Sequence, residues 1–366
     1  MKATTKPRVS ALLTGLTMIA ALAVVGCEGP KGPAGPIGPQ GEQGDLGPAG
    51  PIGQTGSIGQ TGSIGPAGPE GDLGSFSTAD LTCTDCHSSA AFIEGKATAW
   101  EESKHGSGES YVRGGSASCA GCHSGNAFSE RIEAGLAPNE VTMGDPDPTR
   151  QNCYTCHQIH TSYTGDDWAL ETTTAVDLYA IEGATFDGGS GNLCVSCHQP
   201  RRVYPGPNDE GMVTGISSHW GPHHGPQSAM LLGLDGAGVE SSGPSMHYNL
   251  VENTCVACHM GEGDDHSFDA DVTACQACHA GAEDFDINGV QTEIMAMVDE
   301  LGEKLVAAGL IDENSADGHP IVTEAPEAQA AALYNWIYVS HEDKSKGAHN
   351  SQHARALLQA GLDALP

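Results

Sequence analysis

The sequence predicts a mostly α-helical, loop-rich domain with little or no β-structure, preceded by a collagen-like triple helix. Three observations lead to this fold class. Glycine occupies every third position from residue 29 to residue 74. Twelve of the thirteen cysteines fall into six copies of one five-residue motif. Aromatic residues make up only 5% of the 366 residues, so a large hydrocarbon core cannot be assumed.

The charge balance bears on which partners the protein can bind. Fifteen Lys and Arg residues stand against 47 Asp and Glu residues, which gives a formal net charge of -32. Such a chain has no basic surface with which to displace phosphate counterions, so nucleic acid is excluded as a partner. The acidic surface favours high solubility and cationic or metal-bearing partners.

Residues 1–26 are predicted to be an export signal. Lys2, Lys6 and Arg8 form a basic start, and residues 9–25 form an almost uncharged apolar stretch. The alternative, a transmembrane anchor, is disfavoured because the apolar run is short and no charged stop-transfer segment follows it.

The end of this signal resembles the lipobox of bacterial lipoproteins, in the sequence Val24-Val25-Gly26-Cys27. The resemblance implies that Cys27 is acylated, becomes the first mature residue and anchors the protein to a membrane. Several acyl chains on one cysteine give stable anchoring. Glu28, in place of Asp, implies an outer-membrane lipoprotein, facing either the periplasm or the cell surface.

Residues 27–76 are predicted to form a lipidated, collagen-like stalk. Sixteen glycines keep the Gly-X-Y register without a miss, and eight of them are followed directly by proline. Only glycine fits where three polyproline-II-like chains meet, so the pattern predicts a triple helix and a homotrimer rather than a flexible linker. At ~3.1 Å per residue the stalk would be roughly 140 Å long.

The six cysteine motifs all have the form C-x-x-C-H, which is the attachment motif of c-type haem. The two thiols form thioethers to one porphyrin, and the histidine binds its iron. Zinc ribbons and disulfides are the alternatives, but neither requires a histidine after every second cysteine. The sequence therefore predicts a multihaem cytochrome c with six haem irons. The motifs are Cys83-Thr-Asp-Cys86-His87, Cys119-Ala-Gly-Cys122-His123, Cys153-Tyr-Thr-Cys156-His157, Cys194-Val-Ser-Cys197-His198, Cys255-Val-Ala-Cys258-His259 and Cys275-Gln-Ala-Cys278-His279.

Eleven further histidines are available as second axial ligands, which predicts mainly bis-histidine haems of low potential. His160 lies three residues after His157 on one helix face, so it is expected to bind a neighbouring haem rather than the same iron. At least one ligand is expected from the cluster at residues 219–227, although the sequence does not single one out. Any one of these histidines can instead be an ordinary surface or hydrogen-bonding residue. The selected candidates are His105, His160, His223, His247, His266 and His349.

Residues 77–288 are predicted to form the hexahaem domain, and residues 289–366 a helical cap on it. The chain between the motifs is rich in turn-forming residues, whereas helical spacing begins after residue 289. The positions at helical spacing are Ile294, Val298, Leu301 and Leu305, then Ala332, Trp336 and Ser340, and then Leu357 and Leu358 in a segment from about residue 350 to 362.

The region from about residue 80 to residue 366 resembles the extracellular multihaem c-type cytochromes of bacteria that respire on external acceptors. Residues 220–227 and 343–350 are similar to segments of relatives of the pentahaem nitrite reductases and octahaem hydroxylamine-oxidising enzymes. In the nitrite reductases a lysine replaces the motif histidine at the catalytic haem. This chain has no C-x-x-C-K motif and has six haem motifs rather than five or eight. The resemblance therefore implies electron transfer more strongly than catalysis.

Three functions remain to be weighed. The leading hypothesis is an electron carrier or conduit whose partners are redox proteins or extracellular electron acceptors. The alternative is a reductase of a small nitrogen or sulfur oxyanion, which needs one iron with an open position near groups such as Tyr248, Arg201 or Arg202. The third is a purely structural surface lipoprotein, for which six redox cofactors would be superfluous.

Overall fold

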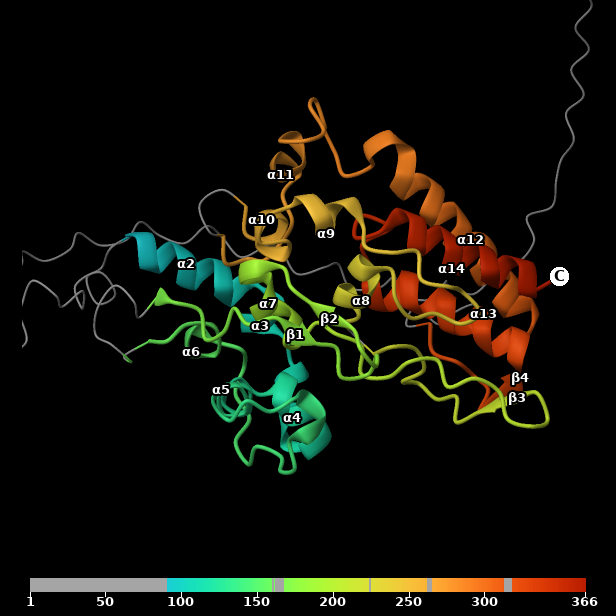
Figure 1. The fold of residues 1–366 in the computed structure, drawn as a ribbon, viewed down its shortest axis with the longest axis horizontal. Coiled ribbons are helices and arrows are strands. Elements are labelled where there is room, and N and C mark those ends of the chain that lie inside the picture. Colours follow the sequence, from blue (N-terminus) through green and yellow to red (C-terminus); the bar gives the residue numbers. More distant parts are fainter. Residues whose placement is uncertain (1–90, 160, 162–167, 224, 262–264, 313–317) are drawn as a thin grey trace, which may run out of the picture. The chain divides into compact units, whose positions relative to one another are not determined.

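Short helices joined by long turns make up most of the fold in a computed structural model of the chain (Figure 1). The structure describes residues 91–159, 161, 168–223, 225–261, 265–312 and 318–366, all of which belong to one compact unit. The predicted signal and lipid site at Cys27, the collagen-like repeat, the motif at residues 83–87 and His160 lie outside the described residues.

The five described haem motifs each include a short helix. The first and second cysteines are three residues apart, so one helical turn brings them to the same face. The backbone N–H groups of His157, His198 and His279 each donate to the carbonyl of the first cysteine of their motif, at 2.8 Å. The motif helices are α4 (Ala117–His123), α6 (Cys153–Cys156), α7 (Asn192–Val195), α10 (Cys255–His259) and α11 (Val272–Gln276).

Other short helices lie between the motifs. They are α2 (Ala91–Glu102), α3 (Lys104–Ser107), α5 (Gly125–Glu133), α8 (Gln227–Leu232) and α9 (Met246–Leu250). Three of them begin at serine caps: Ser103 accepts a hydrogen bond from the Gly106 N–H before α3, Ser124 accepts one from the Ala127 N–H before α5, and Ser245 accepts one from the Tyr248 N–H before α9. Such caps satisfy backbone donors that a short helix leaves unpaired.

The strands of the described region are very short. Strand β1 (Val176–Asp177) pairs with β2 (Thr185–Phe186), and β3 (Met212–Thr214) pairs with β4 (Glu324–Pro326), both antiparallel. The prediction of a mostly helical fold with little β-structure is confirmed. The β3–β4 pair also joins the central part of the chain to the start of its C-terminal helices.

Three longer helices form the C-terminal part: α12 (Val290–Ala307), α13 (Glu327–Ile337) and α14 (Ser351–Ala364). The four apolar positions predicted on the first of these, residues 294, 298, 301 and 305, are all buried. Asn350 caps α14 by accepting a hydrogen bond from the His353 N–H. Helix α13 continues into a wider turn, Tyr338–Asp343, which ends at Lys344 in the left-handed region with φ of 60°.

These helices build a hydrocarbon core that the low aromatic content did not lead us to expect. Trp220, Met230 and other residues from the segment 213–237 are buried in the same cluster as α12, α13 and α14. The Asn335 side chain fixes that segment, accepting from the Ala237 N–H at 2.7 Å and donating to the Ala237 carbonyl at 3.0 Å. Most side chains of this core are aliphatic, and its buried aromatic residues are Trp220, Tyr334, Trp336 and Tyr338.

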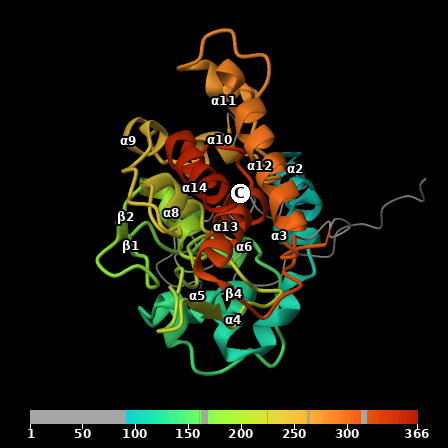
Figure 2. The same ribbon diagram turned by 90° about the vertical axis from the view of Figure 1, so that its right-hand side faces the viewer.

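The motif helices follow one another through the molecule. In Figures 1 and 2, which share a vertical axis, α11 lies at the top, α10 beneath it and α4 near the bottom, and Figure 1 places α7 between α10 and α4. Helices α12, α13 and α14 form one group beside them. In the described part of the chain, no helix combines the length and the apolar character needed to cross a membrane.

Candidate haem-binding site

A single connected cavity runs along the motif helices. Its volume is about 2460 Å³, whereas a pocket for one small ligand usually has about 300–1,000 Å³. Every described motif cysteine and motif histidine lines it. The lining residues are Cys119, Cys122, His123, Cys153, Cys156, His157, Cys194, Cys197, His198, Cys255, Cys258, His259, Cys275, Cys278 and His279.

Five histidines from outside the motifs also line this cavity, and each faces one motif histidine. The distances between ring centres fall in a narrow range, from 6.2 to 6.4 Å. The pairs are His123 with His223 at 6.3 Å, His157 with His266 at 6.2 Å, His198 with His105 at 6.2 Å, His259 with His349 at 6.4 Å, and His279 with His247 at 6.2 Å.

This spacing is the one that two imidazoles need in order to bind one metal ion from opposite sides. An imidazole nitrogen lies about 2.0–2.1 Å from a metal that it binds and about 1.2 Å from its own ring centre, which separates the two ring centres by roughly 6.4 Å. Distance alone does not define a site, because His219 lies 6.5 Å from His223. Unlike the five pairs, those two residues include no motif histidine, and His219 is exposed and does not line the cavity.

Hydrogen bonds orient several of these imidazoles. The Nδ1 atoms of His157, His259 and His247 lie 2.8, 2.9 and 2.7 Å from the backbone carbonyls of residues 168, 268 and 348. A carbonyl can only accept, so each Nδ1 must carry the proton. The other ring nitrogen, Nε2, then has a free lone pair, which is the form that binds a metal.

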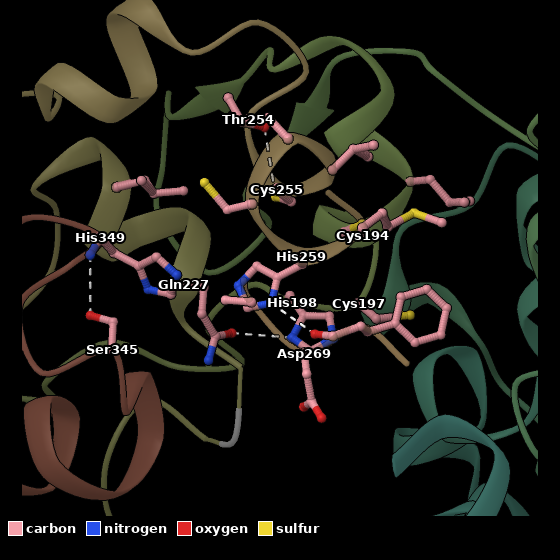
Figure 3. Close-up of a pocket in the computed structure, with 18 of the residues that line it drawn as sticks. Cys194, Cys197, His198, Gln227, Thr254, Cys255, His259, Asp269, Ser345 and His349 are labelled. Atoms are coloured by element: carbon pink, nitrogen blue, oxygen red, sulfur yellow. Dashed lines mark hydrogen bonds between the residues drawn. The ribbon is translucent and has the colours of Figure 1, made fainter. Parts of the chain in front are cut away.

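Two side chains orient two further imidazoles, those of His198 and His349, as Figure 3 shows for Gln227. Gln227 Nε2 donates to the carbonyls of Glu342 and Asp343, so its Oε1 must accept from His198 Nδ1, at 3.2 Å. The carboxylate of Asp343 accepts from His349 Nδ1 at 2.6 Å. Burial alone would lower the pKa of His349, but the charge of Asp343 and this hydrogen bond outweigh it and raise that pKa.

Burial also keeps one facing pair neutral. Removal from water is the main cause that lowers the pKa of His105 to about 4, with a smaller contribution from His198. Burial likewise lowers the pKa of His198. Both rings are therefore uncharged at neutral pH, as a metal ligand must be.

The thiols reveal which motifs are neighbours in space. Cys194 and Cys255 lie close enough to interact, as do Cys122 and Cys197. Cys197 Sγ also lies 3.9 Å from the Cys122 carbonyl oxygen, and Cys255 Sγ lies 4.0 Å from the Gly191 carbonyl oxygen. The nearby charge of Cys275 contributes to raising the pKa of Cys258, after the larger effect of burial. The spatial order is therefore 275–279, 255–259, 194–198 and 119–123. The motif 153–157 lies beside 194–198, since Cys156 interacts with both of its cysteines.

Phe268 lies where three of these sites meet. Its ring centre is 4.9 Å from that of His105 and 5.9 Å from that of His266, and its carbonyl accepts from His259. Its φ of 59° is an uncommon conformation for a residue with a bulky side chain. Backbone strain of this kind tends to occur at functional sites.

The structure thus brings five of the six selected candidates, His105, His223, His247, His266 and His349, opposite a motif histidine, and the sixth, His160, is outside the described residues. His353 instead has a structural role: it is buried, with Nδ1 near Ser242 Oγ and Nε2 bonded to backbone carbonyls. Sequence reasoning did not identify the orienting roles of Gln227 and Asp343. The only signal in the sequence was their position within residues 220–227 and 343–350, the two segments noted for their resemblance to multihaem enzymes.

The donor set fits c-type haem. Thiols stand in pairs one helical turn apart, imidazoles stand in facing pairs, and both line one cavity large enough for several porphyrins. Among the described residues, no group of three or more His, Cys, Asp and Glu could hold a metal ion alone, as a zinc site would.

Comparisons with known proteins agree with both halves of the sequence prediction. Residues 24–79 match the collagen triple helix repeat, and residues 74–158 match the family of cytochrome c7 and related cytochrome c. No curated protein matches the chain. The chain therefore combines collagen-like repeats with a helix-rich multihaem fold whose first part is similar to cytochrome c7.

Two solved structures are similar to the chain. One is the outer cell wall cytochrome OcwA, with 24% identity and a TM-score of 0.47 over 74% of this chain and 50% of that one. The other is an undecahaem cytochrome from the S-layer of Carboxydothermus ferrireducens, with 19% identity and a TM-score of 0.42 over 72% of this chain and 41% of that one. The chain spans half the length of the first structure and less than half the length of the second.

Proposed function

We propose that this protein is an electron-transfer cytochrome with six covalent c-type haems, each iron held by two histidines. The observation that carries the proposal is the set of five facing histidine pairs in one cavity. Each pair combines a motif histidine with a histidine distant in sequence. A bound haem supplies an iron that cycles between Fe(III) and Fe(II).

The protein's own residues have three tasks in this proposal. The ten described cysteines attach the porphyrins, and the ten histidines saturate the irons, so that neither ligand has to move when the charge changes. Backbone carbonyls, Gln227 and Asp343 hold the imidazoles in the metal-binding tautomer. Irons with both of these positions filled by histidine favour electron transfer over chemistry on a bound substrate.

The spatial order of the motifs supports a branched conduit. The motif 194–198 has three neighbours, 255–259, 119–123 and 153–157, whereas 275–279 is next to 255–259 at one end. A haem at 194–198 would therefore connect the others. Electrons would pass between haems that are neighbours in space, for example between 119–123 and 194–198. This path differs from the order of the motifs along the sequence, in which 153–157 lies between those two.

The proposal extends to the regions outside the described residues. Cys27 would carry the lipid anchor of an exported outer-membrane lipoprotein, and the collagen-like stalk would join three chains into a homotrimer. Three six-haem heads held together would offer redox proteins or extracellular acceptors a high local concentration of haems. The match to the collagen triple helix repeat supports the trimer, and the apolar start of the sequence supports export.

The central test counts haems and reports their spin state. The purified protein should have the mass of the processed polypeptide plus six haems, and every ferric haem should be low-spin. Chemical reduction followed by addition of a soluble Fe(III) chelate should reoxidise all six. A mass equal to polypeptide plus zinc would refute the proposal.

The reductase alternative has its own signature. All five described motif histidines face a second imidazole, so an open iron would have to be at the motif 83–87, which lies outside the described residues. A high-spin signal from one haem in six, together with rapid turnover of nitrite or hydroxylamine, would favour the reductase.

The anchor is tested separately. Wild-type protein should sediment with membranes and carry acyl chains on Cys27, whereas Cys27→Ala should remain unprocessed or be released. If Cys27→Ala behaves like the wild type in fractionation and mass, the anchor proposal is wrong.

A further inference from the structure

Resting on the proposed function, we propose that two buried charged side chains set the potentials of two neighbouring haems in opposite directions. Asp343 lowers the reduction potential at the His259–His349 site. Arg131 raises the reduction potential at the adjacent His198–His105 site. The pair creates a step in potential within the conduit.

Asp343 places a full negative charge against an axial ligand. Its side chain is 0% exposed, and its Oδ1 accepts from His349 Nδ1 at 2.6 Å. Its Oδ2 accepts from the backbone N–H and the hydroxyl of Ser345. The neighbouring Lys344 and Lys346 are exposed, so water screens the compensation that they could offer.

The other hydrogen-bonded imidazoles provide the contrast. Those of His157, His259 and His247 donate to backbone carbonyls, and that of His198 donates to the amide oxygen of Gln227. All four acceptors are neutral. A carboxylate draws the Nδ1 proton more strongly than these do and makes the imidazole a more basic ligand. A more basic ligand stabilises Fe(III) over Fe(II), which lowers the potential.

Arg131, in contrast to Asp343, is a buried positive charge. It is only 5% exposed, and its guanidinium donates to the carbonyls of Gly121, Leu136 and Ser196 at 3.0, 3.0 and 3.1 Å. It forms no ion pair with any residue that the structure describes. A Cβ on Gly121 would lie 2.9 Å from Arg131 Cδ, so the glycine of this motif is what lets the arginine pack against it.

The position of this arginine links it to two haem motifs. Gly121 belongs to the motif 119–123, and Ser196 belongs to the motif 194–198. The charge of Arg131 acts on both Cys122 and Cys197, which would hold the porphyrins there. Reduction adds one electron and no proton to a haem, so a nearby buried cation stabilises the reduced form and raises the potential.

The two sites are direct neighbours. Cys194 and Cys255 lie close enough to interact, and Gln227 connects His198 to the backbone of Asp343. Figure 3 shows His198, Gln227, His259 and His349 around one part of the cavity. A lower potential at 255–259 and a higher one at 194–198 give electrons a preferred direction from the first site to the second.

The first experiment replaces Asp343 with asparagine in the full, haem-loaded protein. The asparagine side chain keeps an oxygen that can accept from His349 Nδ1, and its amide N–H can donate to the Ser345 hydroxyl oxygen. The substitution therefore removes the negative charge while the size and shape of the side chain stay nearly the same. In a potentiometric titration followed by EPR, one haem should shift upward, with its ratio of reduced to oxidised form increasing at least tenfold at fixed potential, about 59 mV. Glu300→Gln, which removes an exposed charge on α12, is the matched control and should shift none.

Three further variants have expected shifts in potential of defined sign. Ser345→Ala removes a donor to Asp343, leaves more negative charge for His349, and should shift the same haem downward. Arg131→Met removes the buried cation and should lower the potential of the haem at 194–198, with or without a shift at 119–123, whereas Arg131→Lys should lower it less. A shift confined to 119–123 would overturn the proposed step. A purely structural disturbance would not produce opposite signs at Asp343 and Ser345.

The outcomes separate this inference from the proposed function. If six low-spin haems are present but Asp343→Asn leaves every potential unchanged, the inference is wrong and the proposed function stands. If Asp343→Asn loses a haem, the Ser345→Ala variant decides the question. An upward shift in the potential of the His259–His349 haem, or no shift, would overturn the proposal that Asp343 lowers that potential. If Arg131→Met changes no potential, the role of Arg131 is overturned. Absence of haem from the wild type would overturn the proposed function itself.

Discussion

Replacing His247 with alanine gives the sharpest test of the paired-histidine geometry. The ring of His247 faces that of His279 at 6.2 Å, and a metal between them lies at half that distance from each ring centre. Alanine removes the whole imidazole and leaves His279 as the single protein ligand of that iron. We expect one ferric iron in six to change from low-spin to high-spin, while the other five remain as they are.

The fold should survive this change. His247 contributes one hydrogen bond, from Nδ1 to the Ala348 carbonyl at 2.7 Å, and such a bond is worth about 1 kcal/mol. Helix α9 keeps its N-terminal cap, because Ser245 accepts from the Tyr248 N–H independently of His247. A typical domain has about 5–15 kcal/mol of stability, so the loss is tolerable.

The assay is quantitative EPR on the oxidised protein, with absorbance as a second measure of spin state. Imidazole added to the solution should occupy the open position and restore the low-spin signal, whereas it should not change the wild type. Asn249→Ala, two residues along the same exposed helix, is the control and should leave six low-spin haems. If His247→Ala keeps six low-spin haems without added imidazole, the pairing of His247 with His279 is wrong.

Three further predictions concern stability and the stalk. Leu301→Ala, which empties a fully buried position on α12, should cost about 2–5 kcal/mol in denaturant unfolding and leave the haem spectra unchanged; a loss below 1 kcal/mol would contradict the packing of α12. Burial raises the pKa of the Asp235 carboxyl above its ordinary value of 3.8, even though the Tyr334 hydroxyl donates a hydrogen bond to the carboxylate. The folded protein is therefore stabilised by this group below pH 3.8, and that stability is lost as the pH rises through the raised pKa of the folded state. The free energy of unfolding of Asp235→Asn relative to the wild type should therefore increase from about pH 4 to pH 7, and an opposite slope would refute this. Gly53→Asp should lower the melting temperature of the triple helix, followed by circular dichroism, without altering the haem spectra, and a wild-type monomer at micromolar concentration would show that the stalk does not trimerise.

The sequence predicted the site best where the chemistry is local. The C-x-x-C-H motif places its two cysteines and its histidine within about one helical turn of each other. Their relative positions therefore follow from the sequence, and the motif alone indicates the cofactor. The same holds for α12, where apolar residues at helical spacing predicted the buried face. Neither inference requires knowledge of how distant parts of the chain meet.

The pairing of histidines depends on tertiary structure, and sequence alone left it open. His219 and His223 are in one short cluster, but only His223 faces a motif histidine across the cavity. The partners of the motifs also do not follow chain order: His105 precedes His198 by 93 residues, and His349 follows His259 by 90. The hydrocarbon core was missed for a similar reason, because the residues of the segment 213–237 that enter it are scattered among turns without a regular period.

The closeness of thiols from different motifs has a consequence for how the protein must mature. Cys122 and Cys197, and likewise Cys194 and Cys255, lie close enough to interact in the folded chain. In an oxidising compartment, folding before haem insertion would bring these thiols together and favour disulfides between motifs. Such crosslinks would consume the attachment points of three haems with only two bonds. Thioether formation before folding would avoid these crosslinks, with the porphyrins already present when the cavity around them closes.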